Sequence, residues 1–117
     1  MSNTDQNLSE NPGIIIVSEA DCQELISRED SFKAVESVFG AMARGDAYNF
    51  PVIREAIGHA DALYGFKSGF DKAGMSLGVK SGGYWPGNAA KGLINHQSSI
   101  LLFDPDTGRL QALVGGN

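Results

Sequence analysis

The segment ALYGFKSGFDKAGMSLGVKS, residues 62–81, contains two runs in which apolar residues alternate with small or charged ones. Alternation with a period of two is typical of β-strands, and it predicts strands over 62–70 and 75–81. The two runs are joined by residues 71–74 alone. So short a connection favours an antiparallel pair, because parallel strands need a crossover of about a dozen residues. The segment therefore predicts an antiparallel sheet.

Similar strand patterns occur on both sides of this segment, at residues 14–17, 48–57, 98–104 and 109–114. Gly58-His59-Ala60-Asp61 is typical of a hairpin loop, and Asp104-Pro105-Asp106-Thr107-Gly108 of a type I turn closed by a glycine. Residues 91–97 fit either a loop or one helical turn. Most of the chain after Gly45 is thus expected to form one sheet.

Two helices are expected before the sheet. Ser18, with Asp21 three residues later, resembles a capping box that opens a short helix to about Ile26. A second helix begins either at Ser27, with Asp30 as its partner, or at Asp30 itself, and ends at Gly45. Its apolar residues have the spacing of one buried face: Phe32, Val35, Val38, Phe39 and Met42. The expected fold class is α+β, with an N-terminal strand and helices packed on a mostly antiparallel sheet.

The composition excludes several classes of protein. The chain has 117 residues, a net charge of −5 and one cysteine, Cys22. Scattered cations in an acidic chain argue against nucleic acid as a partner, a lone cysteine forms no internal disulfide, and no apolar run approaches the roughly 20 residues of a membrane span. Residues 1–12 are polar and are expected to form a disordered tail without signal-peptide features, followed by one domain over 13–117. We therefore expect a cytoplasmic protein that does not bind membranes.

The common motifs of cofactor and metal chemistry are absent from the sequence. It has no glycine-rich nucleotide fingerprint, no zinc pattern and no nucleophile elbow. What remains unusual is three cations inside strand patterns, Arg54, Lys67 and Lys80. Each could simply point to solvent, but on a shared face they would form a cationic pocket suited to carboxylates. Glycines beside both lysines would either let backbone approach a small ligand or form bulges.

Several short motifs together resemble the N-terminal domain of the ornithine cyclodeaminase and mu-crystallin family, from about Ile14 to Asn117. They are Lys80 followed by WPGN (85–88), KGL (91–93), HQ (96–97), LLFD (101–104) and TG (107–108). The resemblance implies a substrate-binding and homodimerisation domain. It also implies a following Rossmann domain, missing here, that binds NAD or NADP. The last strand pattern stops at Gly115-Gly116-Asn117 without a polar terminal element, which independently suggests that the chain continues.

The resemblance also implies roles for individual residues. Arg54 is similar to the arginine that grips the substrate α-carboxylate, and Lys80 to the lysine that binds substrate and assists proton transfer. Asn95 lies where some members have a threonine or serine near the cofactor phosphates. His96 matches a variant of the motif that places it in the substrate site.

Residues 48–59 and 64–67 further resemble the branch of this family that reduces iminosuccinate to aspartate. A dicarboxylate is also favoured by charge, because Arg54 can neutralise one carboxylate and Lys67 a second. Ornithine, itself a cation, would fit badly beside these residues. The alternatives are an ornithine cyclodeaminase-type lyase, a non-catalytic small-ligand binding protein like mu-crystallin, and a module that serves dimerisation alone. The ligand expected for the reductase is a small dicarboxylate or an amino-acid-derived imine.

Overall fold

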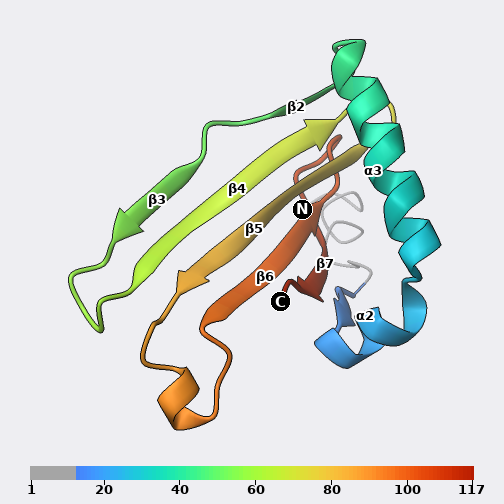
Figure 1. The fold of residues 1–117 in the computed structure, drawn as a ribbon. Helices are drawn as coiled ribbons and strands as arrows, with labels where there is room; N and C mark the ends of the chain where they lie inside the picture. Colours follow the sequence, from blue (N-terminus) through green and yellow to red (C-terminus); the bar gives the residue numbers. More distant parts are fainter. Residues whose placement is uncertain (1–12) are drawn as a thin grey trace, which may run out of the picture.

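A computed structural model describes residues 13–117, whose strands form one seven-stranded sheet (Figure 1). The strand order is β1-β7-β6-β5-β4-β2, and β3 also pairs with β4. The strands are β1 (Ile15–Val17), β2 (Ala47–Asn49), β3 (Ile53–Ala56), β4 (Leu63–Asp71), β5 (Ser76–Tyr84), β6 (His96–Phe103) and β7 (Leu110–Gly115). All pairs are antiparallel except β1 with β7. The expected fold class is confirmed, whereas the disordered tail expected over residues 1–12 lies outside the described residues.

The strand expected over residues 48–57 is wrong in one respect, because the structure divides it into β2 and β3. Pro51 lies in the break and has no N–H to donate to the ladder. Asn49 pairs with Gly69, while Ile53 pairs with Phe66. Between these pairs, three residues on this side (50–52) face two on β4 (67–68), which gives the extra residue of a bulge. Only the Phe50 N–H, which donates to the Ser68 carbonyl at 2.9 Å, ties the break to β4.

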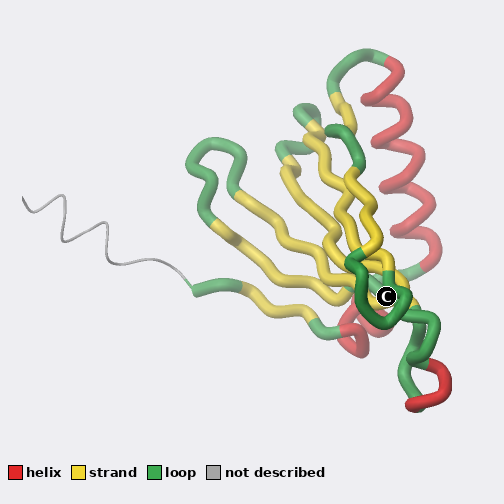
Figure 2. Tube along the Cα trace, turned by 90° about the vertical axis from the view of Figure 1, so that its left-hand side faces the viewer, coloured by secondary structure: helices red, strands yellow, loops and turns green. Residues whose placement is uncertain are grey.

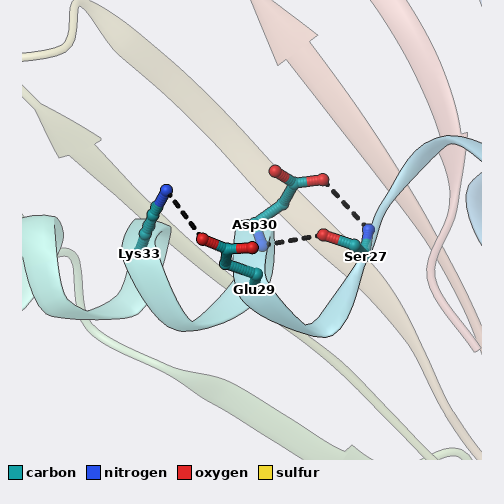
Figure 3. Close-up of polar contacts among 4 residues, drawn as sticks. All are labelled: Ser27, Glu29, Asp30 and Lys33. Carbon is teal, nitrogen blue, oxygen red and sulfur yellow. Dashed lines mark hydrogen bonds and ion pairs between the residues drawn. The ribbon is translucent and has the colours of Figure 1, made fainter.

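The two helices, α2 (Glu19–Leu25) and α3 (Arg28–Ala43), both begin with a complete capping box. At the start of α3, the Ser27 hydroxyl accepts from the Asp30 N–H, and the Asp30 carboxylate accepts from the Ser27 N–H (Figure 3). These bonds satisfy two backbone donors that a helix start otherwise leaves open. Ser27 is therefore the N-cap of α3, and the alternative start at Asp30 is wrong.

The apolar face of α3, however, is not buried, contrary to the sequence prediction. Phe32 is 67% exposed, Val35 50% and Phe39 63%, and Met42 is also exposed. Ala41 is the buried residue of this helix, and Figure 2 shows α3 to one side of the strands. No large side chain among residues 13–117 is fully buried. The periodicity identified the helix correctly, but within the described residues its apolar face has no partner that covers it.

The turns and strand ends position the residues considered below. The hairpin loop after β3 and the turn over Asp104–Gly108 form as expected, with Gly58 at φ 72° and Gly108 at φ 75°. Residues 91–97, for which the sequence allowed a loop or a helical turn, contain parts of both. Lys91 ends the 3₁₀ turn η1 (Ala89–Lys91), a short loop follows, and β6 begins at His96. β5 continues to Tyr84, so Lys80 lies within this strand. In residues 13–117 no helix has the length and apolar character needed to cross a bilayer.

Candidate active site

The strand register places the three strand cations on one face of the sheet. Lys67 of β4 lies directly opposite Lys80 of β5. Arg54 of β3 lies opposite Gly65, two residues before Lys67. Paired residues share a face and side chains alternate along a strand, so all three side chains emerge on the same side. The sequence left open whether Arg54, Lys67 and Lys80 share a face of the sheet, and the register shows that they do.

His96 joins this face from β6. It pairs with Tyr84, which is four residues after Lys80 on β5 and therefore on the same side. Residues that pair with one another across neighbouring strands form a row, and three such rows of this face carry the candidate residues. Lys67 and Lys80 form the first row, Arg54 lies in the second and His96 in the third.

The second row has no side chain at its centre. Gly65 and Gly82 pair with each other there, between Arg54 on β3 and Ser98 on β6. A cavity of about 300 Å³ covers this row and is lined by all four candidate residues. The glycines form its floor, and the charged and ring side chains of the outer rows form its walls.

Glycine is required in this floor by the close approach of the strands. A Cβ on Gly65 would lie 1.9 Å from the Ile53 carbonyl oxygen, and one on Gly82 would lie 1.9 Å from the Gln97 carbonyl oxygen. Gly82 also has φ +157°, a conformation that side-chain-bearing residues rarely adopt. The register runs unbroken through both glycines, so neither forms the bulge that the sequence left open, and the backbone lies uncovered at this point of the face.

The charge of the cavity is positive and is not balanced by its walls. Arg54, Lys67 and Lys80 line it, and no aspartate or glutamate is among its lining residues. The ion pairs of the described residues, Lys33 with Glu29 at 3.0 Å and Arg44 with Asp46 at 3.8 Å, involve other cations. An anion would supply the missing partners, and arginine can bind a carboxylate through two parallel hydrogen bonds.

Asn95 lies beside this cavity, in the loop between β5 and β6. Its Oδ1 accepts from the Ala89 N–H at 2.9 Å, and its Nδ2 donates to the Tyr84 hydroxyl at 3.5 Å. Asn88 crosses the same loop by donating to the Ile94 carbonyl at 3.0 Å. The structure thus uses the Asn95 side chain within the loop.

Sequence reasoning missed two residues of the site, Tyr84 and Ser98. Both line the cavity. Tyr84 is four residues after Lys80 on β5, so both side chains lie on the same face. Extending the period-two pattern past Gly82 would have predicted this position of Tyr84. Ser98 was expected to begin a strand, but its place beside Gly82 depends on the pairing of β5 with β6.

A dinucleotide and a metal ion have no evident place among the described residues. Bound pyrophosphate needs free backbone N–H groups at a helix start. Both helix starts here are already closed by capping boxes, and their first turns carry Glu19 and Asp21 or Glu29 and Asp30, which repel anions. No cluster of metal-ligating side chains occurs in residues 13–117. Residues outside the described part would have to hold the phosphates of a nicotinamide cofactor.

Comparison with known proteins identifies relatives over 89% of the chain. The chain is 60% identical over 104 residues to the iminosuccinate reductase of Paracoccus denitrificans (strain Pd 1222), which covers 89% of this chain and 32% of that enzyme. The crystal structure of that reductase with NAD⁺ superposes with a TM-score of 0.87 over the same shares of the two chains. No protein-family model matches the chain.

More distant structures share the fold. The Δ¹-pyrroline-2-carboxylate reductase of Thermococcus litoralis, solved with NADH and L-proline, has 28% identity and a TM-score of 0.84 over 89% of this chain and 32% of its own. A probable ornithine cyclodeaminase from Bordetella pertussis, at 17% identity and a TM-score of 0.74, covers 88% of this chain and 30% of its own and shows the fold alone. The resemblance to an iminosuccinate reductase that the sequence suggested is thereby confirmed, and the fold is shared with a probable ornithine cyclodeaminase. The chain spans about a third of the length of these relatives.

Proposed function

We propose that this chain is the substrate-binding part of an NAD(P)-dependent imine reductase that converts iminosuccinate to aspartate. The observation that carries the proposal is the shared face of Arg54, Lys67 and Lys80 around a glycine-floored cavity without acidic residues. The relative with 60% identity, an iminosuccinate reductase, supports the same substrate.

The charges of the cavity match those of a small dicarboxylate. Arg54, in the second row, would grip the carboxylate next to the imine carbon, and Lys67, in the first row, would bind the distal one. Lys80 lies directly across from Lys67, within reach of a substrate held between the other two cations. His96 would contact the substrate from the third row. A substrate with a cationic side chain, such as ornithine, would meet three cations and no acidic partner, so a lyase acting on ornithine fits less well.

In this proposal the chain contributes orientation, electrostatics and a proton. A nicotinamide cofactor, held by residues outside the described part, would supply a hydride for the imine carbon. Arg54 and Lys67 fix the two carboxylates, so that one face of the imine carbon is presented to the donor. Lys80 hydrogen-bonds to the imine nitrogen and transfers the proton that this nitrogen takes up as the C=N double bond becomes a C–N single bond. The product is then the amine of aspartate.

The test is the activity of the full-length protein on imines formed from ammonia with oxaloacetate, pyruvate or glyoxylate, in the presence of NADH or NADPH. We expect preferential reduction of the oxaloacetate-derived imine. Lys80→Ala should lower kcat by about 100-fold or more, whereas Lys72→Ala, in the turn between β4 and β5, should not. Near-normal turnover of Lys80→Ala would exclude this lysine from the mechanism. A preference for the pyruvate- or glyoxylate-derived imine would refute the dicarboxylate substrate, and no reduction at all would favour the non-catalytic binding protein.

We further propose a homodimer located in the cytoplasm. Support for the dimer comes from the large apolar side chains left exposed on α3 and elsewhere, since monomers rarely leave apolar patches of more than a few hundred Å² uncovered. The compartment is supported by the single Cys22 in an acidic chain. Light scattering of the full-length protein tests the dimer, and a monomeric mass at micromolar concentration would refute it.

A further inference from the structure

We propose that Tyr84 is a positioning residue that orients the His96 imidazole at the rim of the cavity, and that Asn95 supports Tyr84 from behind. The kinetic consequence of this inference rests on the proposed function, in which His96 binds the substrate. Its structural part, which concerns the orientation of one imidazole, does not depend on activity.

The rings of Tyr84 and His96 form the direct contact. The two residues are directly paired across β5 and β6, and their ring centroids lie 4.8 Å apart with the planes at 57°. Aromatic pairs at this separation attract through their edges and faces. His96 is exposed and has no hydrogen-bond partner for its ring among residues 13–117, whereas Tyr84 is half-buried. The tyrosine ring therefore limits the rotation of the imidazole.

Tyr84 is itself held from the loop that follows it. Its hydroxyl accepts from Asn95 Nδ2 at 3.5 Å, a long hydrogen bond and hence a weak one. Asn95 is fixed more firmly, because its Oδ1 accepts from the Ala89 N–H at 2.9 Å. The resemblance to the family suggested that Asn95 lies near the cofactor phosphates. The contacts point instead to a role directed at the substrate side, through Tyr84.

The rows of the cavity explain why the orientation of His96 would matter. The imidazole stands in the third row, across the glycine floor from Lys67 and Lys80. A substrate held by the cations of the first two rows therefore has His96 on its remaining side. Loss of the Tyr84 ring would leave the imidazole free to rotate, and binding would require it to be ordered again. This cost applies to the bound substrate and to the transition state alike, so it should raise KM and leave kcat nearly unchanged.

A double-mutant cycle on the full-length protein tests the kinetic consequence. Tyr84→Leu should raise the KM for the oxaloacetate-derived imine roughly three- to tenfold, with kcat within about twofold. Tyr84→Phe and Asn95→Asp each remove the hydrogen bond between these two residues and keep the ring at position 84, so each should raise KM by about twofold, less than Tyr84→Leu, because the bond is long and weak. If Tyr84→Leu does not fold, Tyr84→Met replaces it. Tyr48→Leu is the control, because Tyr48 on β2 contacts Phe50, just after that strand, and Phe70 on β4, and does not line this cavity.

The decisive comparison adds His96→Gln. If Tyr84 acts through His96, Tyr84→Leu should add less than about twofold to the KM of His96→Gln, because the two changes remove one interaction. Fully multiplicative effects of the two changes would overturn the proposal. An equal rise in KM for Tyr48→Leu would overturn it as well, since that would indicate a general structural effect.

Nuclear magnetic resonance of the full-length protein labelled with ¹³C at histidine Cε1 gives an independent readout without substrate. The His96 resonance, identified by its loss in His96→Gln, should move when Tyr84→Leu removes the ring current, and should move little in Tyr84→Phe. An unchanged His96 resonance in Tyr84→Leu would overturn the proposal even in an active enzyme. A shifted resonance in a protein that reduces no imine would refute the proposed function and retain the positioning of His96.

Discussion

Lys67 offers the most informative perturbation, because its charge should destabilise the protein and assist its function at the same time. Lys67 and Lys80 are directly opposite each other on β4 and β5, so their Cβ atoms lie about 5 Å apart and the like charges cost roughly 0.2–1 kcal/mol. Both side chains are exposed, which places the cost toward the lower end, since water and salt screen it. Lys67→Met keeps the apolar stem and removes the charge.

We therefore expect Lys67→Met to raise the Tm of the ligand-free full-length protein by about 0.5–2 °C at low salt. The gain should shrink at high ionic strength, because the repulsion that it relieves is already screened there. Lys72→Met is the matched control. Lys72 lies in the turn between β4 and β5 with no cation paired opposite it, and its substitution should leave Tm unchanged.

The same substitution should weaken the response to a dicarboxylate. Succinate at 100 times its Kd would stabilise the native protein by about 2.7 kcal/mol. Loss of a charged hydrogen bond, worth roughly 1.5–3 kcal/mol, raises Kd at least tenfold, so the same succinate concentration should stabilise Lys67→Met by about half as much or less. Differential scanning calorimetry with and without succinate measures both effects. A lower Tm in ligand-free Lys67→Met, or an unchanged response to succinate, would refute the assignment of Lys67 to the second carboxylate.

Three further predictions concern the floor, the cap and the exposed helix face. Gly82→Ala should destabilise the full-length protein by about 2–5 kcal/mol, through a backbone clash and an unfavourable φ. The control Gly87→Ala, at a position with open space around it, should change stability by less than about 0.5 kcal/mol. Equal unfolding midpoints of the two variants in urea would contradict this prediction. Hydrogen bonds from Ser27 lower the pKa of the Asp30 carboxyl, so their stabilisation is complete above the ordinary carboxyl pKa and is lost as pH falls through the lowered value. Ser27→Ala should cost about 1 kcal/mol at pH 7 through loss of the N-cap oxygen but keeps the backbone N–H that Asp30 accepts from, so the variant that should flatten the decline in Tm between about pH 5 and 3 is Asp30→Asn, which removes the titrating carboxyl; a decline in Asp30→Asn parallel to that of the unchanged protein would show that the cap is not the cause. Phe39→Ser should cost about 2–4 kcal/mol in the full-length protein if that ring is covered there, and a loss under about 0.5 kcal/mol in thermal unfolding would show that it stays exposed.

The sequence alone predicted much of this fold because its signals are local. The capping residues Ser18 and Ser27 satisfy helix N–H groups within three positions of themselves, so the helix starts could be identified without tertiary information. The period-two runs and short turns of the sheet are local in the same sense. In the run at 48–57, Pro51 interrupts the alternating pattern, and one expected strand became two strands separated by a bulge. This difference did not alter the fold class.

Burial was less predictable, since a pattern shows which face is apolar and does not show what covers it. Phe32, Val35 and Phe39 have the spacing of a buried face and are nevertheless exposed among the described residues. The sequence likewise identified Arg54, Lys67, Lys80 and His96 as candidates without establishing that they meet. A shift of one residue in the register of any strand would have moved its side chain to the opposite face of the sheet.

What the sequence by itself determined is therefore the type of each element and the chemical character of its residues, because capping, turn formation and alternation act over a few positions. The tertiary structure alone decided that Arg54, the paired lysines and the Tyr84–His96 contact surround one glycine floor. That outcome depends on hydrogen bonds between strands distant in sequence, and those bonds fix the register on which a shared face depends.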